Sequence, residues 1–496
     1  MILDGRRIAS HQRLDGDVVV LGAGAAGITL ARSLARRGHD VLLLESGGFQ
    51  YDPPTQDLYR GTALGEALAP RNEYLAASRL RYVGGSSNHW AGFCRPLDAT
   101  DFERLPWVGE SGWPITEREL RAWYGEAAQV LGIPPFADGP EERGAGGLAL
   151  HADSPLTTPV FHFSGVQHRR AYGPEIEASE RIRLVTWANV TEIALAANGS
   201  SVDHLEVAVL DGPRFEARGR CTVLATGGIE NARLLLASRS VHASGIGNAQ
   251  DLVGRYFMDH PHRRLGRILL TRPPDDLRLW EYWMGPSKRR MPMLHPGVEL
   301  RRERSIGNAL VRIVPEEWQG DRPLEALTDT VAAIDRQRSS HGGAGPGARG
   351  FLYAQIEQVP NPASRVRLDE ERDALGVPRA RLDWRLLPQD LRTLVETSRI
   401  VAAELGRSGV GRAEVCGADA GWDGVIEGNH HMGTTRMART ERQGVVDADG
   451  RVFGLGDLFV TGSSLFPTSG AVNPTFTITA LALRLAEHLD RELEGA

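Results

Sequence analysis

The sequence is poor in cysteine and has almost no lysine. Its three cysteines, Cys94, Cys221 and Cys416, are widely separated, which is too few and too scattered for a disulfide framework or a cysteine-rich metal site. We therefore expect free thiols in a reducing, cytoplasmic compartment and no bound metal. Lys288 is the only lysine, and this bias toward arginine assigns no function by itself.

The sequence also lacks a strong charge of one sign and a long apolar run near its start. The 57 basic and 63 acidic residues give a net charge of -6, too mild for a nucleic-acid or membrane-surface partner. The first apolar run begins at Val18 and breaks at Gly22, too short for a signal peptide or a membrane span. With 41% hydrophobic residues in a chain of 496 residues, the composition is that of a folded, enzyme-sized protein.

The first organised unit reads as strand, glycine turn, helix and strand, with the second strand at residues 41–44. In the GAGAAG turn, Gly22 allows the tight bend, Gly24 lets the backbone approach a pyrophosphate, and Gly27 packs the helix on the strand. Ala25 and Ala26 lie between them. Glu45 ends the second strand, where a carboxylate binds both ribose hydroxyls and repels a 2′-phosphate. The unit predicts FAD or NAD rather than NADP, with a chance glycine turn as the alternative.

Later segments add further parts of a nucleotide-binding domain. We expect strands at 182–185, 191–195, 204–210 and 221–225, a helix at 230–238, a strand at 458–460 and a final helix from 474 to 488. The intervening stretches are rich in Pro, Trp and Arg and have weaker periodicity. The sequence therefore predicts a nucleotide-binding domain built from 1–95, 181–262 and 425–496, and a substrate domain built from 96–180 and 263–424. Within the latter, the glycine-rich stretch 339–350 is expected to be a loop, either a plain linker or a lid.

Several motifs then resemble one family in order along almost the whole chain. They are ESGG from Glu45, GGSSNHW at 84–90, TGGIENARLLLAS at 226–238, DLVGRYFMDHP at 251–261, NHHMGTTRM at 429–437 and the final segment from Ser463. Together they resemble the glucose-methanol-choline (GMC) oxidoreductases, in part their pyranose oxidase-like members. The resemblance implies an α/β FAD-binding domain with a Rossmann-like βαβ core. This domain is interleaved with an α+β substrate domain built on an antiparallel sheet.

The resemblance also implies which further residues contact the flavin cofactor. These residues are Ser46, Gly84, Gly85, Ser86, Asn88, His89, Thr226, Gly227, Gly462, Pro474 and Thr475. One departure concerns the last segment, where many family members carry an aspartate before the small residues and proline. This chain has Thr461-Gly462-Ser463-Ser464 instead, so a backbone or hydroxyl contact would have to replace that carboxylate.

His89 has two interpretations. In members similar to pyranose oxidase and choline oxidase, a histidine at this position of the glycine loop is bonded covalently to a methyl carbon of the flavin ring. The alternative is a histidine that only packs or hydrogen-bonds against FAD. Both remain open from the sequence. His260 in the MDHP motif is interpreted as structural.

His430 and Asn473 are the candidate catalytic residues. Oxidation of an alcohol by a flavin requires a base beside the substrate hydroxyl, and histidine titrates near working pH. In the HxxGT pattern of the family the matching residue is His430, with the adjacent His431 expected to point to the other side. The second family position falls on Asn473. Its alternative interpretation is a plain N-cap, because Pro474 follows at a typical helix start.

The sequence therefore predicts oxidation of an alcohol, CH–OH to C=O, on a small molecule such as a sugar, a glycoside or a natural-product alcohol. Oxygen or another electron acceptor would reoxidise the flavin. One alternative is a lyase of the same family with a non-redox FAD. Others are an NAD(P)H-dependent flavoprotein monooxygenase or reductase, and a non-catalytic FAD-binding protein. The sequence does not identify the alcohol, the acceptor or the oligomeric state.

Overall fold

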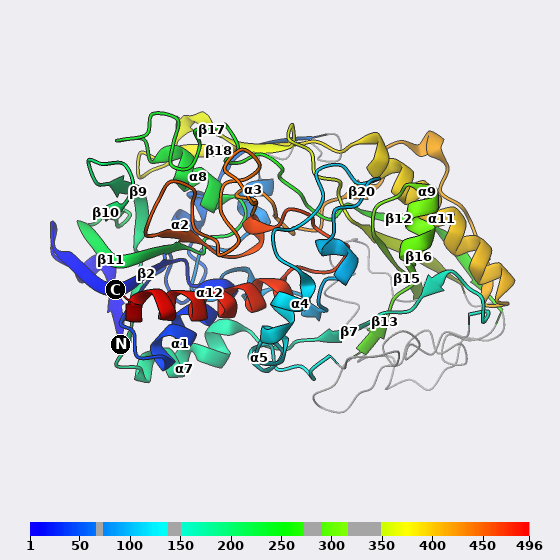
Figure 1. The fold of residues 1–496 in the computed structure, drawn as a ribbon, viewed down its shortest axis with the longest axis horizontal. Helices are drawn as coiled ribbons and strands as arrows, with labels where there is room; N and C mark the ends of the chain where they lie inside the picture. The colour runs from blue at the N-terminus through cyan, green and yellow to red at the C-terminus, as the bar shows by residue number, and fades with distance from the viewer. Residues whose placement is uncertain (66–72, 137–149, 272–289, 316–348, 496) are drawn as a thin grey trace.

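The computed structural model describes residues 1–65, 73–136, 150–271, 290–315 and 349–495. The molecule is elongated, with a large mixed sheet and both chain termini at one end and an antiparallel sheet at the other (Figure 1). The final helix, α12 (Thr475–Gly495), runs beside α1 (Ala25–Arg36) through the middle of the molecule.

The large sheet takes its strands from three distant parts of the chain. Its order is β1-β8-β3-β2-β11-β10-β9, with β21 also paired to β11. The pairs around β2 and β3 are parallel, whereas β9, β10 and the start of β11 form an antiparallel meander. The bounds are β1 (Ile2–Asp4), β2 (Arg13–Leu21), β3 (Val41–Leu44), β8 (Ile182–Thr186), β9 (Asn189–Leu195), β10 (Val202–Ala208), β11 (Arg214–Leu224) and β21 (Leu458–Val460).

Apolar sequence explains why these strands lie at the centre. All four residues of β3 are buried, as are the last four of β2, the pattern of parallel strands covered on both faces. Helix α1 packs on β2, β3 and α12, and it ends before Gly38, whose φ of 97° is the left-handed conformation that favours glycine. The βαβ unit read from the sequence is present.

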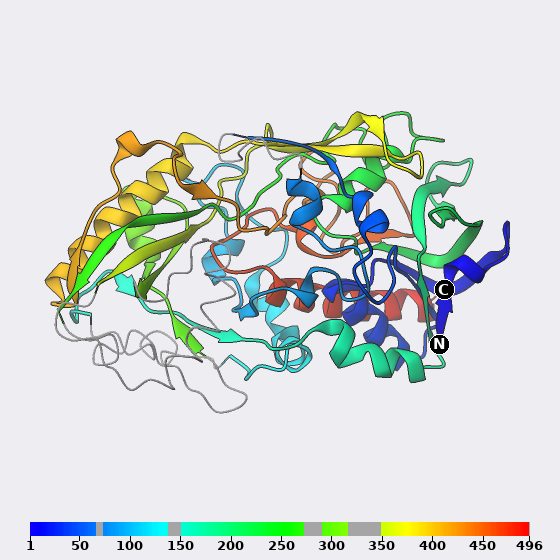
Figure 2. The same ribbon diagram turned by 180° about the vertical axis from the view of Figure 1, so that it is seen from behind.

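The second sheet is antiparallel and lies at the opposite end of the molecule, seen from behind in Figure 2. Its order is β15-β16-β12-β19, with β20 also paired to β12. This confirms the predicted antiparallel sheet. Its strands are β12 (His262–Leu270), β15 (Ala309–Pro315), β16 (Arg349–Ile356), β19 (Gly411–Ala413) and β20 (Val425–Ile426), and α11 (Pro388–Arg407) packs against it.

Shorter elements connect the two ends. The hairpin β17 (Arg365–Arg372) and β18 (Pro378–Trp384) pairs with β4 (Gly61–Gly65), and α8 (Glu230–Ala237) packs against it. The remaining helices are α2 (Pro53–Asp57), α3 (Tyr74–Ala77), α4 (Glu117–Leu120), α5 (Tyr124–Val130), α7 (His168–Ala178) and α9 (Val298–Arg304). The remaining strands are β5 (Phe93–Cys94), β6 (Leu156–Thr157), β7 (Val160–Phe163), β13 (Arg290–Pro292) and β14 (His295–Pro296).

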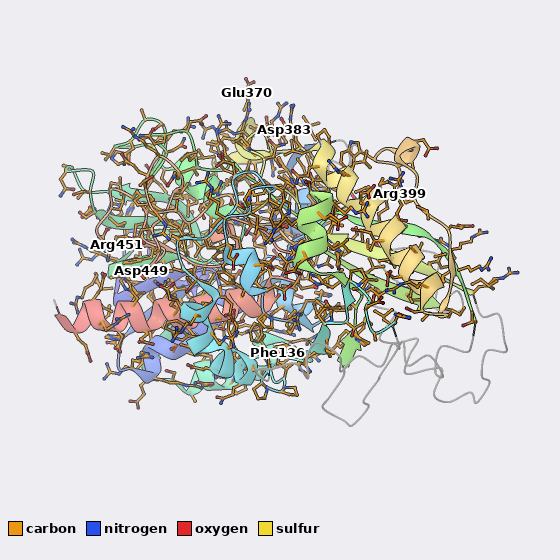
Figure 3. All side chains as sticks on the ribbon, turned by 45° about the vertical axis from the view of Figure 1, so that its right-hand side comes forward. Phe136, Glu370, Asp383, Arg399, Asp449 and Arg451 are labelled. Carbon is orange, nitrogen blue, oxygen red and sulfur yellow. The ribbon has the colours of Figure 1, made fainter. Side chains whose placement is uncertain are left out.

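Charged side chains form ion pairs on the outer surface of α12. Asp449 and Arg451 lie beside this helix (Figure 3), where Arg484 donates to Asp449 at 2.7 Å and Arg451 pairs with Glu492. Exposed ion pairs of this kind contribute only about 0–1 kcal/mol each. The position of α12 therefore depends mainly on its buried apolar face.

Some predicted boundaries differ from the structure. Strand β11 begins at Arg214 rather than Cys221, because its charged residues alternate with buried Phe215 and Ala217 and so hide the strand in a hydrophobicity scan. Helix α12 begins at Thr475 and continues past His488 to Gly495. Most of the predicted loop at 339–350 lies outside the described residues.

Two further findings concern the thiols and the length of the helices. Cys94, Cys221 and Cys416 are all buried and free. Within the described ranges, no helix combines the length and apolar content needed to cross a membrane.

Candidate active site

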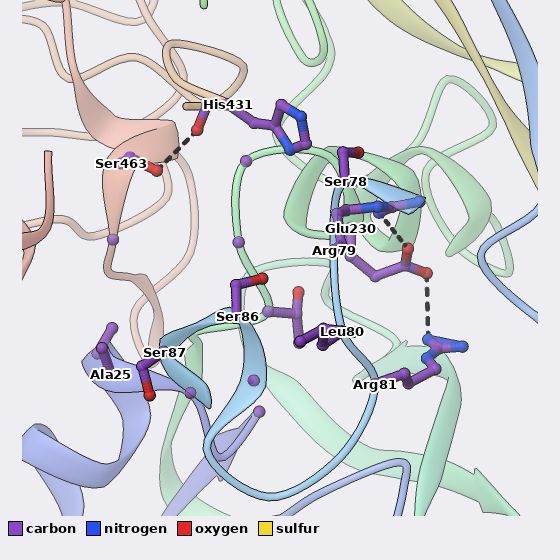
Figure 4. A pocket seen from close by; sticks show the side chains of 18 of the residues that line it. Ala25, Ser78, Arg79, Leu80, Arg81, Ser86, Ser87, Glu230, His431 and Ser463 are labelled. Carbon is purple, nitrogen blue, oxygen red and sulfur yellow. Dashed lines mark hydrogen bonds and ion pairs between the residues drawn. The ribbon is translucent and has the colours of Figure 1, made fainter. Parts of the chain in front are cut away.

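A cavity of about 790 Å³ extends from the glycine turn after β2 to His430 and Asn473. Most of the predicted cofactor positions line it, although they come from distant parts of the chain. They are Gly22, Gly24, Ala25, Ala26, Glu45, Ser46, Gly85, Ser86, His89, Thr226, Gly227, Gly462, Pro474 and Thr475. Figure 4 shows Ala25 at the start of α1 and Ser86 and Ser87 of the glycine loop around this space.

Three predicted cofactor residues lie behind the cavity wall. A Cβ on Gly27 would lie 1.9 Å from the carbonyl oxygen of Gly22, so this glycine permits close packing of helix on strand. The Gly84 amide donates to the Ala23 carbonyl at 2.7 Å. The Asn88 amide donates to the carbonyls of Val83 and Gly85. Gly84 thus joins the two glycine-rich loops, and Gly27 and Asn88 each shape their own loop rather than face the cavity.

The end of the cavity at the glycine turn after β2 suits a pyrophosphate. Helix α1 has Gly24 as its N-cap, with no side chain accepting from its first amides and no acidic residue in its first turn. Those unpaired N–H groups and the positive end of the helix dipole favour an anion. Gly22 has a φ of 97°, and a Cβ there would lie 2.8 Å from the Ala225 carbonyl oxygen.

Glu45 lies buried beside this turn at the end of β3. One carboxylate oxygen accepts from the Ala23 amide at 2.9 Å, and the other accepts from the Gly47 amide at 3.0 Å and from the Ser46 hydroxyl. Burial raises the pKa of Glu45, against these hydrogen bonds and the charge of Arg81. The carboxylate is thus held at the cavity wall, where it can accept from ribose hydroxyls.

Bare backbone forms a cradle along the cavity. A Cβ on Gly24, Gly227 or Gly462 would meet no protein atom within 4 Å, and all three glycines line the cavity. In the segment that replaces the family's aspartate, the Ser463 hydroxyl donates to the His431 carbonyl and the Ser464 hydroxyl accepts from Asn231. Thr461 Oγ1 is buried without a partner among the described residues, and the Gly462 backbone is the part of this segment left open to a cofactor.

A buried ion cluster borders the cavity near Glu45. Glu230 accepts from Arg79 at 3.1 Å and from Arg81 at 3.4 Å (Figure 4). Although burial opposes it, the charges of Arg233, Arg81 and Arg79 lower the pKa of Glu230 to about 2. The Glu230 carboxylate is therefore ionised, and it holds the loop segment that carries Arg79 and Arg81.

His89 reaches the cavity from the loop that follows the glycine turn at Gly84 and Gly85. Its Nε2 lies 2.9 Å from the Tyr82 hydroxyl. The hydrogen bond to Tyr82 engages Nε2, while the ring itself remains exposed to the cavity. Both interpretations of His89 are compatible with this position.

The catalytic segment is held by the buried carboxylate of Asp259. One oxygen accepts from the amides of His260 and His430 at 2.7 and 2.8 Å, and the other accepts from the Asn429 amide and the Tyr74 hydroxyl. Burial raises the pKa of Asp259 to about 7, against these donors. Asp259 thereby fixes the backbone on either side of the candidate base.

A chain of hydrogen bonds decides which nitrogen of His430 carries its proton. His260 Nε2 lies 3.0 Å from the Gly470 carbonyl oxygen, which can only accept, so this nitrogen carries the proton. Burial lowers the pKa of His260 to about 4, and the neutral ring then has an acceptor at Nδ1. His430 Nδ1 lies 2.9 Å from that acceptor and must donate to it. His430 Nε2 is left as the acceptor.

Asn473 completes this chain. Its Nδ2 lies 3.1 Å from His430 Nε2, as expected for a donor facing an acceptor. Gln355, which donates to the Ala471 carbonyl at 2.7 Å, lies 3.5 Å from Asn473 Oδ1 and so orients the amide. In α12 the first helical carbonyl to accept is that of Pro474, from Ile478. The Asn473 side chain faces His430 rather than an amide of the helix.

His430 is neutral in this environment. Burial lowers its pKa well below the ordinary value, and the nearby rings of His260, His262 and His431 act in the same direction. The adjacent His431 turns away, with its Nε2 3.1 Å from the Tyr74 hydroxyl. The structure thus brings His430, not His431, together with Asn473.

Sequence reasoning missed three residues near this site. His260 was interpreted as structural, and neither His262 nor Gln355 was singled out. The signal available was the spacing in DHPH, because residues two apart on an extended chain point to the same side.

Elsewhere, His204, Glu206 and Glu216 form the one potential metal-ligand group among the described residues. His204 is already hydrogen-bonded to Asp203 and Glu206, and the group does not line the cavity.

The fold and the cavity are those of a dinucleotide-binding protein with a neutral histidine, His430, at the cavity wall. Residues 20–49 match the family model of an NAD(P)-binding Rossmann-like domain, and residues 360–482 match that of GMC oxidoreductases. The chain carries the C-terminal domain of the GMC oxidoreductases and has GMC-type relatives. These enzymes use FAD, and the glycine cradle, the helix N-terminus and Glu45 fit that cofactor.

Curated relatives and solved structures agree with this assignment. The chain is 25% identical to 2-methyl-1,2-propanediol dehydrogenase of Mycolicibacterium austroafricanum, over 96% of this chain and 95% of that protein. It is 26% identical to paromamine 6'-oxidase of Streptomyces fradiae, over 96% and 92%. The structure is similar to pyridoxine 4-oxidase from Mesorbium loti, with a TM-score of 0.62 and 20% identity over 95% of this chain and 98% of that one.

The cradle predicts a contrast between two glycine substitutions. Gly24→Ala places a methyl group in the cavity without touching protein atoms, so the FAD-free protein should keep its stability while FAD binding weakens. Gly27→Ala creates an overlap with Gly22 and should lower the free energy of unfolding by about 1–3 kcal/mol. Thermal unfolding of the FAD-free protein and fluorescence titration with FAD measure both effects. Undiminished FAD affinity in Gly24→Ala would contradict the proposed cofactor position.

Proposed function

We propose that this protein is an FAD-dependent enzyme that oxidises an alcohol carbon, CH–OH to C=O. The observation that carries the proposal is the pair formed by His430 Nε2 and Asn473 Nδ2, 3.1 Å apart at the end of the cavity. A neutral imidazole acceptor and an amide donor at one point are suited to bind a hydroxyl group and remove its proton.

Each partner has a separate task in the reaction. Without substrate, the lone pair of His430 Nε2 accepts from Asn473 Nδ2. A substrate hydroxyl takes the place of that contact and passes its proton to Nε2, while the Nδ1–H of His430 remains bonded to His260. Asn473 donates to the substrate oxygen as negative charge develops on it. FAD, when bound, supplies the acceptor for the hydride that leaves the carbon. The alcohol thus loses one proton to the protein and one hydride to the cofactor, which leaves a carbonyl group.

The relatives support a hydroxylated small molecule as the substrate. Their names specify a propanediol, paromamine, fructose and a C-glycoside, which are all compounds with more than one polar group. We infer a sugar, a glycoside or a natural-product alcohol for this chain, with oxygen or another electron acceptor completing the cycle.

The function predicts a strong dependence on His430. Loss of a positioned base typically slows a reaction by about 10²–10⁴, so His430→Ala should reduce the rate of anaerobic flavin reduction by alcohols within that range. FAD binding should be retained. The matched control is His431→Ala, which should lose much less activity because His431 faces Tyr74. NADH and NADPH should not reduce the flavin.

Variants of Asn473 test the same pair. In Asn473→Asp, a carboxylate would face the lone pair of His430 Nε2, and the contact becomes favourable only when His430 takes up a proton and ceases to be a base. Asn473→His restores a donor. The aspartate variant should therefore be the slower of the two. Equal rates for asparagine and aspartate would indicate that Asn473 serves only at the helix start, and a greater loss in His431→Ala would make His431 the base.

His89 carries a further proposal, a covalent bond to the flavin. It is supported by the position of the ring at the cavity wall and by the resemblance of GGSSNHW to family members with this linkage. After acid precipitation the yellow colour should stay with the protein, and His89→Ala should release its flavin. Complete release from the unmodified protein would leave packing against FAD as the role of His89.

A further inference from the structure

One face of the antiparallel sheet points toward His430 and Asn473. His262 on β12 pairs with Gln355 on β16, which pairs with Leu310 on β15. Two residues further along β16, Tyr353 pairs with Arg312 on β15. Directly opposed residues share a face of a sheet, as do residues two apart on a strand. His262, Gln355 and Tyr353 therefore project from the same face.

His262 and Tyr353 have unused hydrogen-bonding capacity. The His262 side chain is 2% exposed, and neither ring nitrogen has a hydrogen-bond partner of normal geometry among the described residues. The Tyr353 hydroxyl is buried and also unpartnered within the described ranges. The two rings meet edge to face, with centroids 5.8 Å apart. Buried polar atoms without partners are costly and infrequent in folded proteins.

A small second cavity lies beside these groups. It has a volume of about 20 Å³, is lined by His262, Tyr353, Gln355 and Asn473 among others, and shares His262, Asn473 and Phe93 with the large cavity. That volume holds about one water molecule or one hydroxyl group. By contrast, His168 is equally buried and unpartnered but lines neither cavity, so burial alone does not identify such a site.

We propose that His262 and Tyr353 form a subsite that binds a second hydroxyl group of the substrate, next to the carbon that is oxidised. The substrate class is therefore a vicinal diol or polyol rather than a simple alcohol. This inference rests on the proposed alcohol oxidation, because the subsite is adjacent to Asn473.

The chemistry of the subsite favours a hydroxyl over an apolar or charged group. Burial and the nearby Arg312 lower the pKa of His262 well below the ordinary value, and the neighbouring Gln355 amide only partly opposes this. Burial raises the pKa of Tyr353. Both side chains are thus neutral, and each can donate and accept, as a hydroxyl does. An apolar substituent would leave the ring nitrogens and the phenol unpaired.

The experiment uses the FAD-loaded protein and three probes with a common ring size. Cyclohexanol, trans-cyclohexane-1,2-diol and 1,5-anhydroglucitol carry no, one and several additional hydroxyls. In anaerobic flavin reduction, the apparent KM for the diol should be roughly tenfold lower than for cyclohexanol, the effect of one or two buried hydrogen bonds. His262→Phe and Tyr353→Phe should each reduce this preference severalfold.

Matched controls separate the subsite from general effects on folding. His168→Phe and Tyr124→Phe remove equally buried, unpartnered groups that line neither cavity, and they should keep the preference for the diol. A preference that survives in both His262→Phe and Tyr353→Phe, or its absence from the unmodified protein, would overturn the proposal.

A binding measurement distinguishes failure of the subsite from failure of the proposed reaction. Titration of FAD-loaded His430→Ala with the diol, followed by the flavin absorption spectrum, gives a Kd without turnover. If the Kd rises severalfold when His262→Phe is added, the subsite is supported. If, in addition, no alcohol reduces the flavin of the unmodified protein, only the proposed oxidation is refuted. An unchanged Kd refutes the subsite whether or not alcohols are oxidised.

Discussion

The hydrogen bond from His260 Nε2 to the Gly470 carbonyl, 3.0 Å long, is the constraint on which the candidate active site depends. A carbonyl oxygen cannot donate, so it fixes the proton of His260, which in turn fixes the proton of His430 at Nδ1. The lone pair of His430 Nε2 then faces Asn473 and the cavity. One chain of contacts decides the position and the proton state of the candidate base, His430, and His260 holds it in place.

The fold supplies this chain from segments that are far apart in sequence. Asp259 and His260 precede β12, Gly470 and Asn473 precede α12, and Gln355 is the next-to-last residue of β16. Asp259 accepts from the amides of both histidines and so joins the start of β12 to the segment that carries the candidate base. The glycine turn, Glu45 and the N-terminus of α1 meet the same cavity from the other side. The expected cofactor-binding residues and the candidate base thus come from different parts of the fold and share one cavity.

The local parts of this arrangement could be predicted from the sequence. The βαβ unit, Glu45 and the strand at Leu458–Val460 are signalled by glycine spacing and apolar runs, and the family motifs indicated His430 and Asn473. The first half of β11 was missed because its charged residues alternate with buried ones. His260 was interpreted as structural, but its contact with Gly470 was not predicted, because the two residues lie 210 positions apart. The unpartnered state of His262 likewise depends on tertiary packing, which sequence spacing does not show.

The most direct test of the central claim is ¹⁵N NMR of the histidine-labelled, FAD-loaded protein during a pH titration, with His430→Ala used to assign the resonances. Because burial lowers the pKa of His430, its protonated form should appear only well below the ordinary histidine pKa of about 6.5. From pH 8 down to that value, we expect the proton to remain on Nδ1 and Nε2 to stay unprotonated. A proton on Nε2, or titration of His430 near its ordinary pKa, would contradict the account.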